Sequence, residues 1–294
     1  MQSSGEPPAA WFSAALAAPA SDGSVGVAGA RICYRAWGEA GRPGAVLVHG
    51  TAAHARWWDH IGPLLAAGGL RIAALSISGH GDSGWRDHYS FDQWADEVQA
   101  VASDAGIAGP PFVIGHSLGG HIALRTAELY GDDLAGIVVV DSPVWEGTPP
   151  PEASVRGRGS RPARPYASRE EIIGRFRLFP DQEVLPYIRD HVAAGSVTSR
   201  AGGAWGWKYD QAVFAKMTRA PLPASTAGPV GCRAAILRAE RGTLDAEMAA
   251  RLGARLGPAV PVIELPAGHH VMLDEPLSLV SAVRALLACW TAAG

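Results

Sequence analysis

Ser117 lies at the centre of a short pattern whose residue types could support nucleophilic chemistry. An apolar run, Phe112–Ile114, leads into Gly115-His116-Ser117-Leu118-Gly119, and a helix-like pattern follows. A strand before and a helix after this pattern leave room only for a very tight turn, which lifts the side chain at its apex clear of the sheet. Both glycines are needed because a Cβ at either position would collide with the turn. A serine hydroxyl held in this way becomes a nucleophile once a base takes its proton.

Two adjacent histidines near the C-terminus are the candidates for that base. Gly268-His269-His270 follows the run Val260–Leu265, which we interpret as the last strand of a sheet. His269 directly follows the glycine and is the predicted base, and His270 is the alternative. The alternative to a catalytic role is that both residues are surface histidines on a loop.

A carboxylate must orient the base, and three residues could supply it. Asp141 ends the β-branched run Ile137–Val140, which is typical of a buried parallel strand. Ligands bind at the carboxyl ends of strands in open α/β sheets, so we expect Asp141 at the same edge as the reactive serine. Alternatively, Asp141 has only a structural role and caps the Ser-Pro turn that follows it. Glu240 is the next candidate acid, and Asp245 is the third.

Taken together, these motifs resemble those of the α/β-hydrolase superfamily. The Gly-x-Ser-x-Gly pattern is similar to its nucleophile elbow. His49-Gly50-Thr51-Ala52 resembles the turn that supplies a backbone N–H to an oxyanion hole, and Gly79-His80-Gly81-Asp82-Ser83 resembles its Gly-His-Gly-x-Ser loop. Many relatives carry Asp where Ser76 stands. The segment from Gly268 to Pro276 is similar to the C-terminal histidine motif.

The resemblance implies a role for each residue. Ser117 would be the nucleophile and His269 the base, and the backbone N–H groups of Thr51 and Leu118 would form the oxyanion hole. Most relatives carry the acid after the seventh strand, where Thr243 stands here, and a hydroxyl cannot stabilise an imidazolium as a carboxylate does.

Some members of the superfamily place the acid at the end of the sixth strand. Asp141 lies 141 − 117 = 24 residues after the nucleophile, the spacing associated with those members. We therefore expect a carboxylate oxygen of Asp141 within about 3.2 Å of the ring nitrogen of His269 that faces away from Ser117.

The predicted fold class is α/β, with a mostly parallel sheet and helices on both faces. Residues 1–141 and 231–294 would form this hydrolase core, and residues 142–230 a helical lid inserted after the sixth strand. Helices are predicted over 168–179 and 182–193 of the lid. An amphipathic helix is predicted over 91–104 of the core, with Asp96 and Glu97 on its solvated side.

The lid sequence also contains large aromatic residues that could line an apolar pocket. Their alternative role is to form the lid's own core, since aromatic side chains dominate core burial in general. They are Trp145, Trp205, Trp207 and Phe214.

Composition limits the classes of partner. The chain has 294 residues, of which 48% are hydrophobic, and a formal net charge of −3 from 25 basic and 28 acidic residues. No basic field is present that would attract nucleic acid or an anionic membrane, so a small molecule is the expected partner. The three cysteines, Cys33, Cys232 and Cys289, are too few and too far apart for a disulfide framework or a zinc knuckle.

Targeting signals are not evident either. The N-terminal segment lacks a basic leader and is interrupted by prolines, and no apolar run reaches the roughly 18 residues of a membrane span. These features predict a cytoplasmic protein. We expect no cofactor and no metal, and the oligomeric state is left open.

The predicted activity is hydrolysis of a carboxylic ester or lactone through an acyl-enzyme on Ser117. A serine at this position argues against haloalkane dehalogenases and epoxide hydrolases, relatives that use an aspartate there. Carbon–carbon bond hydrolysis and acyl transfer on the same triad are alternatives. A non-catalytic ligand-binding homologue is a further alternative, in which the serine would be unreactive.

Overall fold

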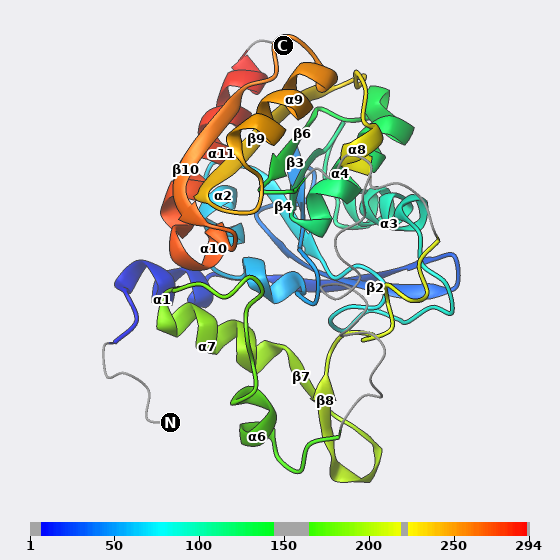
Figure 1. Cartoon of the computed structure of the whole chain (residues 1–294), viewed down its shortest axis with the longest axis vertical. Helices are drawn as coiled ribbons and strands as arrows, with labels where there is room; N and C mark the ends of the chain where they lie inside the picture. Colours follow the sequence, from blue (N-terminus) through cyan, green and yellow to red (C-terminus); the bar gives the residue numbers. More distant parts are fainter. Residues whose placement is uncertain (1–6, 144–164, 219–222, 293–294) are drawn as a thin grey trace.

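The computed structural model describes residues 7–143, 165–218 and 223–292. An eight-stranded sheet runs through the centre of the molecule (Figure 1). Its outermost strand β1 is antiparallel to β2, β2 is antiparallel to β4, and the remaining neighbours are parallel. The prediction of a mostly parallel α/β sheet is confirmed. In spatial order the strands are β1 (Ser21–Val27), β2 (Ala30–Trp37), β4 (Arg71–Leu75), β3 (Gly44–Val48), β5 (Phe112–His116), β6 (Gly136–Val140), β9 (Arg233–Arg241) and β10 (Val262–Gly268).

Helices cover both faces of this sheet, as expected for a parallel sheet whose strands are apolar on both sides. Three long helices pack on one face, namely α3 (Phe91–Asp104), α4 (Leu118–Tyr130) and α9 (Ala246–Leu256). The opposite face is covered by α1 (Ala10–Ala17), η1 (Ala55–Trp58), α2 (Gly62–Ala66), α10 (Val271–Asp274) and α11 (Pro276–Ala292). A short turn, η2 (Gly131–Asp133), follows α4. Among these described residues, no helix combines the length and apolar character that crossing a bilayer requires.

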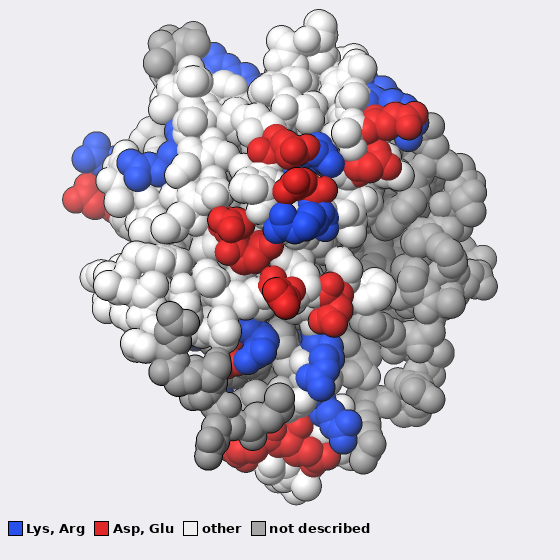
Figure 2. Space-filling model, turned by 60° about the vertical axis from the view of Figure 1, so that its left-hand side comes forward, with Lys and Arg blue, Asp and Glu red and all other residues white. Residues whose placement is uncertain are grey.

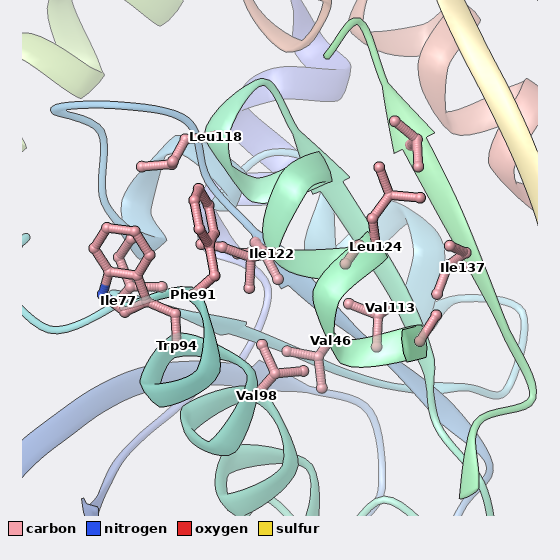
Figure 3. Close-up of a cluster of buried hydrophobic side chains, with 14 of the residues drawn as sticks. Val46, Ile77, Phe91, Trp94, Val98, Val113, Leu118, Ile122, Leu124 and Ile137 are labelled. Carbon is pink, nitrogen blue, oxygen red and sulfur yellow. The ribbon is translucent and has the colours of Figure 1, made fainter. Parts of the chain in front are cut away.

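The core beside the nucleophile turn is formed where α3 and α4 meet the central strands (Figure 3). Trp94 and Val98 of α3 are fully buried against strand residues such as Val46 and Val113. Burying a side chain of this size contributes about 1.5–3 kcal/mol. The turn between β5 and α4 is therefore anchored on both sides by packed elements.

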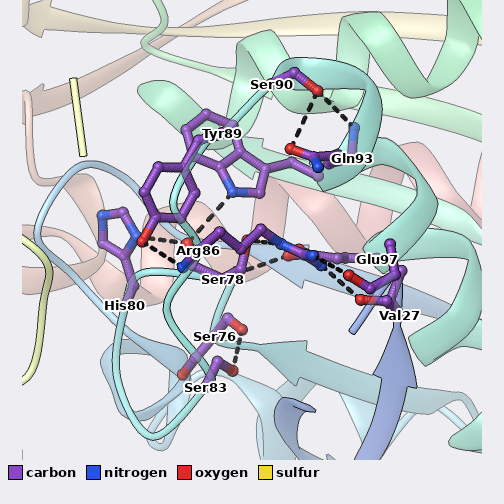
Figure 4. Close-up of polar contacts among 12 residues, drawn as sticks. Val27, Ser76, Ser78, His80, Ser83, Arg86, Tyr89, Ser90, Gln93 and Glu97 are labelled. Carbon is purple, nitrogen blue, oxygen red and sulfur yellow. Dashed lines mark hydrogen bonds and ion pairs between the residues drawn. The ribbon is translucent and has the colours of Figure 1, made fainter. Parts of the chain in front are cut away.

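Glu97 corrects one expectation from the sequence. Its side chain is not solvated, because it has 0% exposed area and pairs with Arg86 at 3.0 Å. Figure 4 shows how this pair holds the loop after β4, since Glu97 accepts a hydrogen bond from the Ser78 amide at 2.8 Å. Arg86 also donates to the backbone carbonyl of Val27 at 2.7 Å. Helical periodicity identified the apolar stripe of α3, but it could not show that Arg86, in the loop leading into this helix, covers the Glu97 carboxylate.

The segment inserted after β6 contains a hairpin as well as helices. Its described part contains α6 (Arg169–Ile173) and α7 (Pro186–Gly195), which are both shorter than predicted. The first helix ends at Ile173, where Gly174 is the C-cap residue, and the second begins only at Pro186, a residue favoured in the first helical turn. The hairpin pairs two short strands antiparallel. The other described elements of the segment are β7 (Val197–Ser199), η3 (Ala201–Gly203), β8 (Trp205–Trp207) and α8 (Pro223–Thr226).

Charged residues of both signs are interspersed on the surface shown in Figure 2. Several blue and red side chains lie next to one another on this face, and much of the area between them is uncharged. This distribution agrees with the near balance of 25 basic and 28 acidic residues.

Candidate functional site

Ser117 occupies a strained turn between β5 and α4. Its backbone has φ 54° and ψ −116°, a combination that costs a non-glycine residue about 1–3 kcal/mol. A Cβ at Gly115 would lie 2.0 Å from the Gly119 carbonyl oxygen, and a Cβ at Gly119 would lie 2.3 Å from the Val48 carbonyl oxygen. The Ser117 amide donates to the Val140 carbonyl at 3.0 Å and so fixes the turn to β6. The turn is thus closed by glycines, and the strain does not depend on the serine hydroxyl.

Asp141 lies directly after β6 and contacts His269. Its Oδ2 accepts a hydrogen bond from His269 Nδ1 at 2.7 Å and another from the Thr243 amide at 2.8 Å, and its Oδ1 accepts from the Ala239 amide at 3.0 Å. Burial alone would raise the pKa of Asp141, but the hydrogen bonds from His269 and the two amides outweigh it and lower the pKa below its usual value. The group is therefore an ionised carboxylate that faces one imidazole nitrogen.

Two residues after β9 shape this contact. A Cβ at Gly242 would lie 2.3 Å from Asp141 Oδ1, so only glycine leaves space for the carboxylate. Thr243 Oγ1 lies 3.1 Å from Asp141 Oδ2 and 3.0 Å from His269 Nδ1. Thr243 stands in the sequence where relatives carry an acid, but the sequence could not show that the Thr243 hydroxyl bridges Asp141 and His269. Gly242 was missed because a single glycine in a loop gives no sequence signal.

The other two candidate acids lie elsewhere. Glu240 pairs with Arg241 at 3.0 Å, and its side chain is 53% exposed. Asp245 caps α9, where its Oδ1 accepts from the Met248 amide at 2.7 Å. Among the described contacts, neither carboxylate reaches His269.

His270 and His116 surround His269. The ring centroid of His269 lies 4.9 Å from that of His270 and 4.7 Å from that of His116. Burial lowers the pKa of His270 to about 3, and neighbouring His269 contributes to that shift. The His270 amide donates to Gln182 Oε1 at 2.8 Å, so a residue of the inserted segment holds the histidine loop. Sequence reasoning missed Gln182, which belongs to no motif.

The turn after β3 faces the same region. His49 braces it, since its Nδ1 lies 2.7 Å from the Gly50 carbonyl oxygen and its Nε2 accepts from the Ile77 amide at 3.2 Å. Within the described residues, the N–H groups of Thr51 and Leu118 donate to no backbone carbonyl. Their assignment to an oxyanion hole stays a prediction.

These groups meet at a cavity of about 450 Å³. Ser117, Thr51, Thr243 and both adjacent histidines line it, together with residues of the inserted segment. Of the aromatic residues predicted to line a pocket, Trp207 and Phe214 do so, whereas Trp205 is outside the lining and hydrogen-bonds with Tyr166 through its backbone. Trp145 lies outside the described residues.

A serine at a strand–helix turn, followed along the chain by an aspartate and then a histidine at the ends of later strands of the sheet, defines the α/β-hydrolase class. Residues 45–283 match the alpha/beta hydrolase family, and the chain belongs to that family. The family resemblance inferred from the motifs is confirmed.

Known relatives include several lipases and esterases. The lipase LipV of Mycobacterium tuberculosis is 25% identical over 270 residues, which cover 85% of this chain and 95% of that protein. A monoacylglycerol lipase of Mycolicibacterium smegmatis is 33% identical over 39% of this chain and 44% of its own length.

Among solved structures, the thioesterase domain from the curacin biosynthetic pathway superposes with a TM-score of 0.73 at 17% identity, covering 90% of this chain and 99% of its own. A Mycobacterium tuberculosis esterase superposes with a TM-score of 0.72 at 20% identity, covering 92% of each chain. Both likenesses concern the fold.

Proposed function

We propose that this protein is a serine hydrolase that cleaves carboxylic esters through an acyl-enzyme on Ser117. The observation that carries the proposal is the 2.7 Å contact between Asp141 and His269, beside a cavity that His269 shares with the strained Ser117. The names of the relatives, a lipase and a monoacylglycerol lipase among them, support ester bonds as the target.

Acylation would begin with proton transfer from Ser117 Oγ to His269 Nε2 as the serine oxygen attacks the ester carbonyl. Asp141 accepts the hydrogen bond of Nδ1–H, which fixes the tautomer with a free Nε2 lone pair and stabilises the imidazolium that forms. The amides of Thr51 and Leu118 would bind the oxyanion. Return of the proton to the alkoxide would release the alcohol.

Deacylation would repeat the sequence with water. His269 Nε2 takes a proton from the water as its oxygen attacks the acyl carbonyl, and it returns that proton to Ser117 Oγ when the acid leaves. The net reaction consumes one water and requires no redox step.

Residues 142–230 would act as a lid that shapes the substrate site. Its described part supplies Trp207 and Phe214 to the cavity, and Trp57 of the core lines it as well. Apolar walls around a few polar groups are the usual composition of small-molecule sites. We therefore assign a substrate with an apolar chain, either an acyclic ester or a lactone.

A panel of nitrophenyl esters with rising acyl length, together with simple lactones, tests this proposal. The wild-type protein should hydrolyse some members, and Trp207→Ala should lower kcat/KM for long acyl chains about tenfold more than for acetate. Trp85→Ala is the matched control, because Trp85 is 46% exposed and outside the cavity. Equal losses for short and long chains would contradict the assigned role of Trp207, and a folded protein inactive on the whole panel would contradict ester hydrolysis.

A further inference from the structure

Three histidines converge beside the nucleophile. His116 ends β5, and His269 and His270 follow β10. Each offers one nitrogen, and these three atoms lie within 4.8 Å of one another. All three side chains are at least nine-tenths buried and line the cavity. Ester hydrolysis as described uses only one of these rings, so the other two need an explanation.

Hydrogen bonds determine which nitrogens are available. His116 Nε2 lies 2.8 Å from the His269 backbone oxygen, so this nitrogen carries the proton and Nδ1 keeps its lone pair. That Nδ1 is buried without a partner among the described residues. His269 donates from Nδ1 to Asp141 and keeps the lone pair of Nε2. A backbone carbonyl and a carboxylate are the usual outer partners of metal-bound histidines.

His270 provides the third nitrogen. Its side chain is 6% exposed, and its ring interacts with the backbone of Phe179 and Pro180, although within the described part of the chain neither ring nitrogen makes a hydrogen bond of normal geometry. A ring held on one side by backbone carbonyls keeps a second nitrogen with a lone pair for a metal.

We propose that His116 Nδ1, His269 Nε2 and a ring nitrogen of His270 bind one Zn²⁺ ion, and that this ion inhibits the enzyme. Three neutral imidazoles suit zinc, with the fourth position open to the cavity. Zinc–nitrogen bonds of about 2.0–2.1 Å place tetrahedral ligands about 3.3 Å apart, so nitrogens up to 4.8 Å apart must approach one another by up to about 1.5 Å. The cavity provides the entry path.

The inhibitory part rests on the proposed function, because it assumes that His269 is the base. Once Nε2 donates its lone pair to zinc, it can no longer accept the proton of Ser117 Oγ. Asp141 would then hold a metal-bound imidazole instead of a catalytic one. No bond to Ser117 is required for this effect.

Direct binding of Zn²⁺ is tested first by calorimetry on the purified full chain. Wild-type protein should bind one ion, and His270→Phe should weaken binding at least about tenfold. His88→Phe is the matched control, since His88 is an exposed histidine that contacts Thr218 outside the cavity, and it should bind as wild type does. His270→Gln serves as a second variant if the phenylalanine variant does not fold. If wild-type protein does not bind Zn²⁺, or if folded His270→Phe binds it as tightly as wild type, the proposed site is wrong.

The second readout is the rate at which a fluorophosphonate probe labels the protein. Zn²⁺ should slow labelling of wild type at least tenfold and a chelator should restore it, whereas labelling of His270→Phe should be far less sensitive to the ion. Labelling that proceeds normally with zinc bound would overturn the inhibitory role. Failure of labelling without zinc would count against the proposed function and leave the calorimetric result standing, so the two failures are distinguishable.

Discussion

Asp141 reaches His269 across an intervening strand. The carboxylate follows β6 and the imidazole follows β10, and β9 lies between them in the sheet. The contact of 2.7 Å is possible because Gly242, just after β9, has no side chain where the carboxylate lies. The proposed triad therefore depends on the absence of a side chain at position 242 as well as on Asp141 and His269.

Replacing Gly242 by alanine tests this dependence. The new Cβ would meet the Asp141 carboxylate at 2.3–2.5 Å, so the carboxylate must move away from His269. We expect kcat to fall about 10²-fold and the free energy of unfolding to fall by about 1–3 kcal/mol. Gly26→Ala is the control, since no atom lies within 4 Å of its added Cβ. Full activity in a folded Gly242→Ala protein would contradict the packing argument.

Asp141→Asn should keep the shape of the site but hold the imidazole in the wrong tautomer. By analogy with serine proteases, kcat should fall by about 10⁴-fold. Glu240→Gln should change kcat far less, because Glu240 pairs with Arg241 at the surface. Steady-state kinetics on one ester decides between the acids, and a larger loss for Glu240→Gln would move the role to that residue.

The two adjacent histidines should differ in the same assay. His269→Ala removes the proposed base and should reduce kcat by about 10⁴-fold or more, whereas His270→Ala should stay within about tenfold of the parent. The reason is that His269, and not His270, bonds to Asp141. The reverse ranking would assign the base to His270.

Much of this site could be predicted because its members lie at strand ends. Ser117 and Asp141 each follow a continuous apolar run, and runs of this type form neighbouring parallel strands whose carboxyl ends meet. Gln182 and the hairpin of the inserted segment could not be predicted, because their positions depend on contacts with residues distant in the sequence. Glu97 was misassigned because helical periodicity does not show that Arg86, in the loop just before α3, covers its carboxylate.

Buried neutral histidines should make folding sensitive to mild acid. Burial lowers the pKa of His121 in α4 from 6.5 to about 4, so the unfolded chain binds a proton more readily than the folded chain. The stability that the neutral ring contributes is present above the unfolded pKa and is lost as the pH falls below it towards the folded pKa.

This effect is measurable by urea unfolding at several pH values. Between about pH 8 and about pH 5, one such histidine accounts for a loss of about 2 kcal/mol in the free energy of unfolding. His121→Leu should lose less than wild type over that interval by about this amount. Parallel pH dependences for the two proteins would show that His121 is not held neutral by burial.

The central claim is that Ser117 is the nucleophile, and mapping of a fluorophosphonate adduct by peptide mass spectrometry tests it most directly. Wild-type protein should carry one adduct on Ser117. Ser117→Ala should carry none and lose turnover by about 10⁴-fold or more, with an unchanged Tm because the glycines close the turn. An adduct on another residue, or an active Ser117→Ala protein, would contradict the account.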